Sequence, residues 1–171
     1  RAAHRASRRS RRWPGAGARW TRAGRTHRRS RRLPRSAGRY GPALHAKKFA
    51  QEKHKHLYRP NRAKQPVIEH LEEVANLVRE AGGSDEEIAA GWLHDIVEDT
   101  PVTIRIIEEK FGPEVSEIVD GLTDPDHFEP LPLQERKALQ AQRLKSKPNS
   151  VKRVKLCDQI SNVKSVLHDP P

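Results

Sequence analysis

A histidine and three carboxylates gather at the end of one predicted helix. His94 and Asp95 are followed by Glu98 and Asp99, after an apolar stretch that ends at Leu93. Positions four residues apart are neighbours on a helix, so the sequence places two polar pairs side by side. An imidazole beside a carboxylate forms half of a divalent metal site with nitrogen and oxygen ligands. The second carboxylate pair, one turn further on, is placed to take a proton from an attacking water.

The same residues also allow a purely structural interpretation, in which they form a polar helix end. A single histidine is favoured at the negative end of a helix dipole. Three carboxylates are not favoured there, and they repel one another. A bound cation would supply the missing counter-charge. The spacing therefore favours a metal site, with a polar helix end as the alternative.

Two further residues could complete such a site. His54 lies at the end of one predicted helix, and Asp158 interrupts the apolar face of the last predicted helix, 151–167. A buried carboxylate without a partner is costly, so Asp158 needs a cation nearby. A salt bridge to Lys155 or Arg153 is the simpler alternative to a metal.

The elements that must position these residues are all predicted to be helices. Apolar residues recur at helical spacing in seven segments, and no convincing run of alternating polar and apolar residues predicts a strand. Ser84 and Glu87 form a capping box at the start of the third helix. The predicted helices span residues 43–55, 67–78, 84–97, 104–111, 113–122, 133–145 and 151–167. The expected fold is an all-α bundle around one core.

Charge is divided unevenly along the chain. Of its 34 Lys and Arg residues, 15 are arginines within residues 1–45, which contain no acidic residue. We expect residues 1–42 to be a disordered, Arg-rich, low-complexity leader, because this composition cannot bury enough apolar surface to offset chain entropy. Such a leader is either an arm for nucleic acid or an anionic surface, or a stretch with no folded role. Residues 43–171 form the predicted domain, which is slightly acidic.

Cysteine content and hydropathy exclude several classes of protein. Cys157 is the one cysteine of the sequence, so these residues form no internal disulfide and no cysteine-based metal cluster. We interpret Cys157 as a small core residue. No apolar run approaches the roughly 20 residues needed to span a bilayer, so no membrane partner is expected. The leader lacks the apolar segment of a secretory signal, and a cytoplasmic protein is predicted.

These residues and several longer strings resemble a known family. His54, His94-Asp95 and Asp158 are similar to the H…HD…D signature of the HD phosphohydrolase superfamily. The longer strings resemble the RelA/SpoT-type (p)ppGpp hydrolase domain, in the same order along the chain. They are Ala-Gly-Trp-Leu-His-Asp-Ile-Val-Glu-Asp-Thr (90–100), Phe-Gly-Pro-Glu-Val (111–115), Gly-Leu-Thr-Asp (121–124), Glu-Arg-Lys (135–137) and Val-Lys-Leu-Cys-Asp-Gln-Ile-Ser-Asn-Val (154–163), with Val-Ile-Glu-His-Leu (67–71) in place of its YxxH segment. The resemblance covers residues 43–171 and is greater to the small stand-alone hydrolases, such as the metazoan type, than to the long bifunctional enzymes.

The resemblance implies a function and a set of site residues. The implied protein is an all-α HD-domain bundle that hydrolyses the 3′-diphosphate of (p)ppGpp, releases pyrophosphate and uses Mn2+ or another divalent metal. The implied metal ligands are His54, His94, Asp95 and Asp158, and the residues that activate water are Glu98 and Asp99. The implied nucleotide contacts are Arg59, His70 and Asn162. His70 could equally be a core histidine.

The chain departs from the family pattern where the family binds its nucleotide. The family's RRK-like cluster is Tyr58-Arg59-Pro60 here, the aromatic residue of YxxH is Val67, and its Thr-Asp-Asp string is Thr123-Asp124-Pro125. The chain also ends where the family continues into further helices, as expected of a C-terminally truncated fragment.

Two alternative functions follow from these departures. One is an HD phosphohydrolase for another nucleotide, such as NADPH or a nucleoside monophosphate. The other is a non-catalytic nucleotide- or RNA-binding protein, in which the leader would be the part that contacts nucleic acid.

Overall fold

The part of the chain that the computed structural model describes is helical. It comprises residues 41–60, 64–128 and 130–168, with no β-strand among them and one isolated bridge between Tyr58 and Pro66. These residues form α1 (Pro42–His54), α2 (Val67–Glu80), α3 (Asp85–Leu93), α4 (Ile96–Asp99), α5 (Ile104–Phe111), α6 (Pro113–Leu122), the 3₁₀ helix η1 (Asp126–Phe128), α7 (Leu133–Lys145) and α8 (Asn149–His168). The predicted all-α fold is confirmed. Residues 1–40 of the predicted leader lie outside the described residues.

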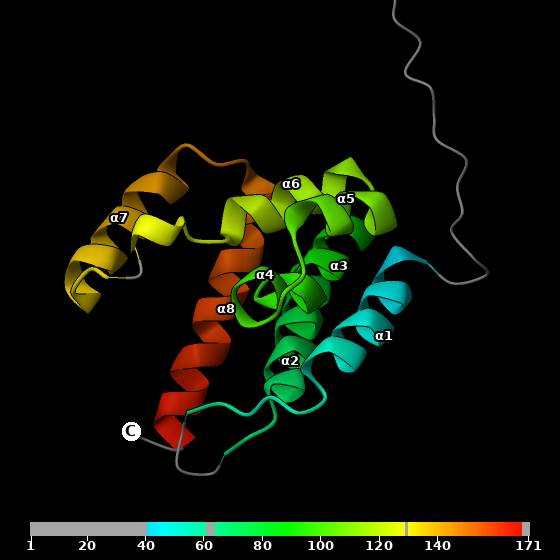
Figure 1. Cartoon of the computed structure of the whole chain (residues 1–171), viewed down its shortest axis with the longest axis horizontal. Coiled ribbons are helices and arrows are strands. Elements are labelled where there is room, and N and C mark those ends of the chain that lie inside the picture. Colours follow the sequence, from blue (N-terminus) through cyan, green and yellow to red (C-terminus); the bar gives the residue numbers. More distant parts are fainter. Residues whose placement is uncertain (1–40, 61–63, 129, 169–171) are drawn as a thin grey trace, which may run out of the picture. The chain divides into compact units, whose positions relative to one another are not determined.

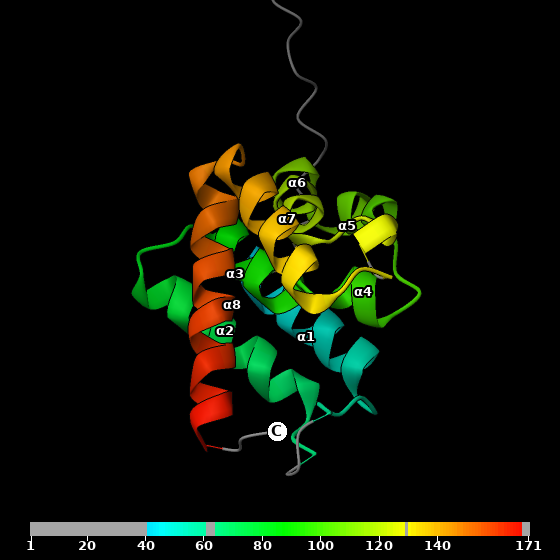
Figure 2. The same ribbon diagram turned by 90° about the vertical axis from the view of Figure 1, so that its left-hand side faces the viewer.

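The central helix of the bundle is α3. It packs against α1, α2, α6 and α8, which lie around it in Figures 1 and 2. Every residue from Glu87 to Leu93 is buried. Because neighbours cover all its sides, α3 is apolar nearly all round its axis rather than along one stripe. A polar side chain at its C-terminal end is therefore placed inside the bundle.

Gly91 allows α2 and α3 to approach closely. A Cβ atom at position 91 would lie 3.1 Å from Cα and 3.3 Å from N of Ala75 in α2. Contacts this short involve backbone atoms, so a larger residue at position 91 would force the two helices apart. The spacing of α2 and α3 is thus set by a single glycine.

Local capping signals begin and end helices where the sequence predicts. The Ser84 side chain accepts from the Glu87 N–H at 3.2 Å, and the Glu87 carboxylate accepts from the Ser84 N–H at 2.7 Å. Thr103 caps α5 by accepting from the Ile106 N–H. Gly112, with a φ of 89°, ends α5 immediately before α6. The predicted capping box is confirmed.

The predicted helix 84–97 is wrong as a continuous element, because it breaks after Leu93. His94 and Asp95 form a turn between α3 and α4, and Asp95 has φ −97° and ψ −1°. The N–H groups of Glu98 and Asp99 both donate to the Asp95 carbonyl, at 3.1 and 2.8 Å. Neither proline nor glycine marks the break, so helical periodicity alone could not predict it.

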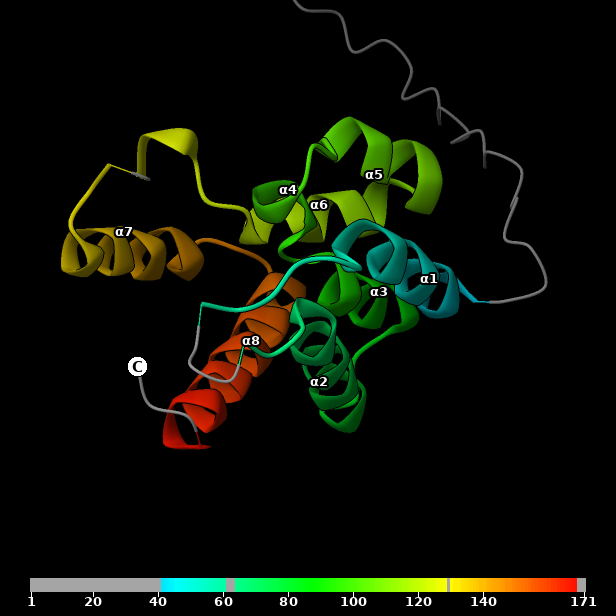
Figure 3. The same cartoon turned by 60° about the horizontal axis from the view of Figure 1, so that its bottom comes forward.

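Two outer features of the bundle bear on the site. Helix α7 lies to one side of the other helices in Figure 3 and has no buried residue. Arg143 connects it to the end of α6 by donating to the carbonyl oxygens of Thr123 and Asp120, at 2.5 and 3.0 Å. Helix α8 leaves an apolar row exposed, formed by Leu156, Ile160, Val163 and Leu167. No helix in the described ranges has the length and apolarity needed to cross a membrane.

Candidate metal centre

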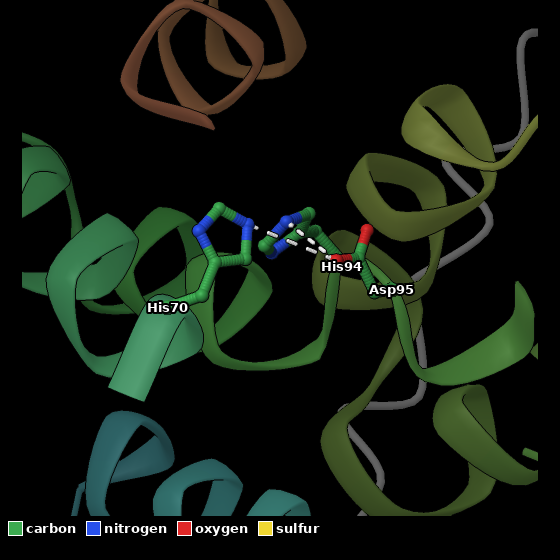
Figure 4. Close-up of side chains that lie close together, drawn as sticks. All are labelled: His70, His94 and Asp95. Carbon is green, nitrogen blue, oxygen red and sulfur yellow. Dashed lines mark ion pairs between the residues drawn. The ribbon is translucent and has the colours of Figure 1, made fainter. Parts of the chain in front are cut away.

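Four side chains from three parts of the fold converge in the bundle. Figure 4 shows His70 from α2 pointing toward His94 and Asp95 at the break between α3 and α4. One ligand atom from each of these three residues lies within 4.8 Å of the others. Asp158 on α8 joins them, since its Oδ1 lies 3.4 Å from His70 Nε2 and 3.7 Å from His94 Nε2. The convergence of two imidazoles and two carboxylates fits a divalent cation with mixed nitrogen and oxygen ligands.

The His94 ring is oriented as a metal-binding histidine. Its Nδ1 lies 2.9 Å from the Gly91 carbonyl oxygen, to which it donates, so the neutral ring carries its lone pair on Nε2. Nε2 is buried and makes no hydrogen bond with any described residue. The Asp95 Oδ2 atom lies 3.2 Å from Nε2, without the alignment of a hydrogen bond. This buried nitrogen therefore needs a further partner, which a cation would provide.

The His70 ring is fixed by a chain of hydrogen bonds behind it. The Ser161 hydroxyl donates to Glu73 Oε2 at 2.6 Å, so it accepts from the His70 Nδ1–H at 2.9 Å. Lys164 completes the chain with an ion pair of 3.0 Å to Glu73. Burial would raise the pKa of the Glu73 carboxyl, but Ser161 and Lys164 outweigh it and lower that pKa. The chain leaves the His70 Nε2 lone pair directed at Asp95 and Asp158.

The titratable groups of this centre shift one another's pKa values. Burial by itself would lower the pKa of His94, but the carboxylates of Asp95 and Asp158 outweigh it and raise that pKa well above its usual value. Burial would likewise raise the pKa values of both carboxyls. The histidines reverse this effect, so Asp95 and Asp158 have pKa values below the usual range. Both carboxylates are therefore ionised at neutral pH, as metal ligands must be.

Asp158 also links the centre to two polar residues on its own helix. Lys155 Nζ lies 2.9 Å from Asp158 Oδ2, so the salt bridge considered from the sequence is present beside the histidine contacts. Burial would lower the pKa of Lys155, but Asp158 outweighs it and keeps the ammonium charged. The Asn162 amide donates to Asp158 Oδ1 at 2.6 Å and accepts from Arg59 at 2.6 Å. Arg153 pairs instead with Glu87, at 2.5 Å.

His54, expected among the metal ligands, lies apart from this group. Its Nδ1 contacts the Ala50 carbonyl oxygen at 3.1 Å, and its buried Nε2 lies 3.6 Å from Asp99 Oδ2. The reason is the packing of the helices: the end of α1 faces α4, whereas α2 brings His70 to the turn after α3. In this structure His70, which the sequence assigned to the nucleotide or the core, lies with His94 and Asp95, and His54 does not belong to that group.

Glu98 faces the same turn from α4. Its Oε1 accepts from the Asp124 N–H at 2.8 Å. Burial raises the pKa of the Glu98 carboxyl, and the carboxylates of Asp95 and Asp124 add to this effect although the Asp124 N–H opposes it. A carboxylate with a raised pKa is a better proton acceptor near neutral pH.

Sequence reasoning missed the residues that support the histidines. Ser161 and Glu73 hold the His70 ring, but a serine and a surface-type glutamate on two predicted helices carry no signal of their own. The available clue was that Ser161 continues the helical face of Val154 and Cys157, three positions after Asp158.

Comparison with known proteins identifies the family of the chain. Residues 46–171 match the HD domain family. The chain belongs to the HD domain family. A Xenopus tropicalis protein named guanosine-3′,5′-bis(diphosphate) 3′-pyrophosphohydrolase MESH1 is 38% identical over 130 residues, which are 75% of this chain and 71% of that protein. A Synechocystis protein, named as a probable guanosine-3′,5′-bis(diphosphate) 3′-pyrophosphohydrolase, is 36% identical over 114 residues. These residues are 65% of this chain but 15% of that protein.

A solved structure is also similar to the chain. It is described as a metazoan ortholog of SpoT that hydrolyses ppGpp and plays a role in starvation responses. The two align with a TM-score of 0.69 and 27% identity, over 77% of this chain and 74% of the other. The expected resemblance to the small stand-alone HD hydrolases is confirmed.

Proposed function

We propose that the chain hydrolyses the 3′-diphosphate of (p)ppGpp and releases pyrophosphate. The observation that carries the proposal is the convergence of His70, His94, Asp95 and Asp158 beside the carboxylate of Glu98. The activity named for the Xenopus protein, and the one described for the solved metazoan structure, support the choice of substrate.

The proposed metal ligands are His70, His94, Asp95 and Asp158, with Mn2+ as the proposed cation. Two nitrogen and two carboxylate donors suit Mn2+ among other first-row divalent metals. When bound, the cation supplies Lewis-acid polarisation of the phosphoryl group. The side chains themselves contribute orientation, because hydrogen bonds from Nδ1 hold both imidazoles with Nε2 toward the centre.

Glu98 is the proposed general base. The oxygen of water attacks the phosphorus joined to the ribose O3′, and Glu98 takes a proton from that water. The bond between phosphorus and O3′ breaks, O3′ gains a proton, and pyrophosphate departs with the water oxygen. The raised pKa of the Glu98 carboxyl favours this proton transfer.

Asp99 and His54 are proposed to act as a second pair at the edge of the centre. The 3.6 Å separation of His54 Nε2 and Asp99 Oδ2 is suited to an imidazole that orients the carboxylate. Arg59 and Asn162 are proposed to contact the nucleotide. Asn162 connects Arg59 to Asp158 by two hydrogen bonds of 2.6 Å, which brings a guanidinium next to the centre.

The test is pyrophosphate release from ppGpp in the presence of Mn2+, with NADPH and nucleoside monophosphates as competing substrates. Glu98→Gln is expected to lower kcat by about 10²- to 10⁴-fold, because it removes the proton acceptor. Glu117→Gln, an exposed glutamate of α6, is the matched control and is expected to keep full activity. Full activity of Glu98→Gln, or the absence of pyrophosphate release by the unaltered protein, would overturn the proposal.

A further inference from the structure

A cavity of about 190 Å³ lies between α6, α7 and α8. Its lining includes apolar residues, three cationic side chains, one carboxylate and two amides. The lining residues are Gly121, Leu122, Asp124, Lys137, Gln140, Ala141, Arg143, Leu144, Lys155 and Gln159. The excess of positive charge distinguishes this cavity from the carboxylate-rich metal centre.

The cavity adjoins the proposed active site through two of its lining residues. Lys155 lines the cavity and also contacts Asp158 at 2.9 Å. Asp124 lines the cavity, and its N–H donates to the proposed base, Glu98, at 2.8 Å. A group in the cavity is therefore a neighbour of one proposed metal ligand and of the proposed base.

Most charged groups of the wall are engaged within the protein. Arg143 donates to backbone carbonyls at the end of α6, and the Asp124 carboxylate accepts from Gln140. Lys137 differs, since its ammonium forms no ion pair or hydrogen bond with the residues in the described ranges. The wall thus presents a lysine whose charge is available to a ligand.

We propose that this cavity is the subsite for the distal phosphoryl group of the 3′-diphosphate, with Lys137 as its specificity-determining residue. The inference rests on the proposed function. In a diphosphate the second phosphoryl group is joined to the first through one oxygen, so it lies next to the reacting phosphorus and carries negative charge. The carboxylates of the metal centre repel that charge, whereas the wall with Lys155 and Lys137 attracts it.

The charge of the cavity wall favours a phosphate group over a purine base as the occupant of the cavity. The apolar lining residues and the amides of Gln140 and Gln159 would accept a base. Three cationic side chains against one carboxylate favour an anionic occupant. Because the cavity adjoins Asp158 and Glu98, that anion would be part of the diphosphate rather than a distant part of the nucleotide.

The experiment compares Lys137→Gln with Lys145→Gln in the full chain. Both substitutions remove one positive charge from an exposed lysine of α7, but Lys145 does not line the cavity. The substrates are ppGpp and the corresponding nucleotide with a 3′-monophosphate. Lys137→Gln is expected to lower kcat/KM for the 3′-diphosphate by roughly tenfold or more and to leave the 3′-monophosphate unchanged. Lys145→Gln is expected to change neither.

Binding of inorganic pyrophosphate and inorganic phosphate to the Mn2+-loaded protein provides a second measurement. Lys137→Gln is expected to weaken pyrophosphate binding by a similar factor without weakening phosphate binding. An equal loss for both substrates would assign the cavity to the base or to the fold, and no loss for either would exclude Lys137. Both results overturn the subsite. If the unaltered protein does not hydrolyse ppGpp at all, the proposed function fails, and the binding comparison still decides the subsite.

Discussion

Ser161 supports the proposed metal centre without belonging to it. Its hydroxyl accepts from the His70 Nδ1–H and is buried. Ser161→Ala removes that acceptor and frees the ring to turn, so Mn2+ affinity is expected to fall by about 10- to 100-fold. Metal titration of the purified variant measures the effect. Ser165→Ala, on the same helix, is the control, and an unchanged affinity of Ser161→Ala would show that the hydroxyl has no part in holding His70.

A substitution at His54 can distinguish two roles for this residue, which are orientation of a carboxylate and binding of a metal. If His54 orients Asp99, His54→Gln lowers kcat by roughly tenfold and leaves Mn2+ affinity unchanged. If His54 binds the cation, as the sequence pattern implied, the same variant loses metal affinity. Turnover and metal titration on one preparation distinguish the two roles.

The residues of the centre could be predicted only in part from the sequence. His94, Asp95 and Glu98 stand together in the chain, so local spacing was enough to select them. His70 and Ser161 are separated by 91 positions. Their contact depends on how α2 crosses α8, which neither residue type nor periodicity encodes. The choice between His54 and His70 therefore required the packed structure.

At the scale of helices, the spacing of α2 and α3 sets the distance between two proposed ligands, His70 and His94. Gly91→Ala places a Cβ 3.1 Å from the backbone of Ala75 and is expected to cost about 1–3 kcal/mol of unfolding free energy. It is also expected to weaken Mn2+ binding, because the helices that carry the histidines move apart.

The matched control for this change is Val78→Ala, which creates a cavity in the core of α2. It is expected to destabilise the fold by a comparable amount while leaving Mn2+ affinity nearly unchanged. Denaturant unfolding and metal titration of the two variants provide the comparison. Equal affinities for Gly91→Ala and the unaltered protein would show that the helix spacing does not govern the centre.

Most helices could be predicted because their signals are local. The Ser84 capping box, Thr103, Gly112 and Pro113 each mark a boundary by their own chemistry. The break at His94 and Asp95 has no such mark. It exists because α3 is enclosed by other helices while the chain must leave the core, which is a property of the bundle.

For the whole molecule, a bound cation would join three separate parts of the chain, since its proposed ligands come from α2, the turn after α3, and α8. Mn2+ is therefore expected to raise Tm, and a chelator to reverse the rise. None of the proposed ligands comes from residues 1–40, which lie outside the described residues and remain a predicted leader.

The stabilisation by Mn2+ is expected to depend on pH. Protons compete with metal for His94, and its raised pKa extends that competition above the usual range of histidine. Metal affinity is therefore expected to fall as pH falls through the pKa of His94, by about tenfold per pH unit for one displaced proton. Thermal unfolding with and without Mn2+, between about pH 6 and pH 8, measures the trend. A Tm increase that does not vary with pH would contradict it.

The sequence of helix α8 is also expected to constrain how related proteins diverge. Within eight positions it carries Lys155, Asp158, Ser161 and Asn162, which contact the cavity, the proposed metal ligands, the His70 ring and Arg59. A short segment exchanged between relatives would transmit all four contacts in one event. A change at a single one of them would leave its partner on another helix or loop unmatched. Diverging lineages are thus expected to inherit this segment as a block, with Glu73 and Arg59 changing in step with it.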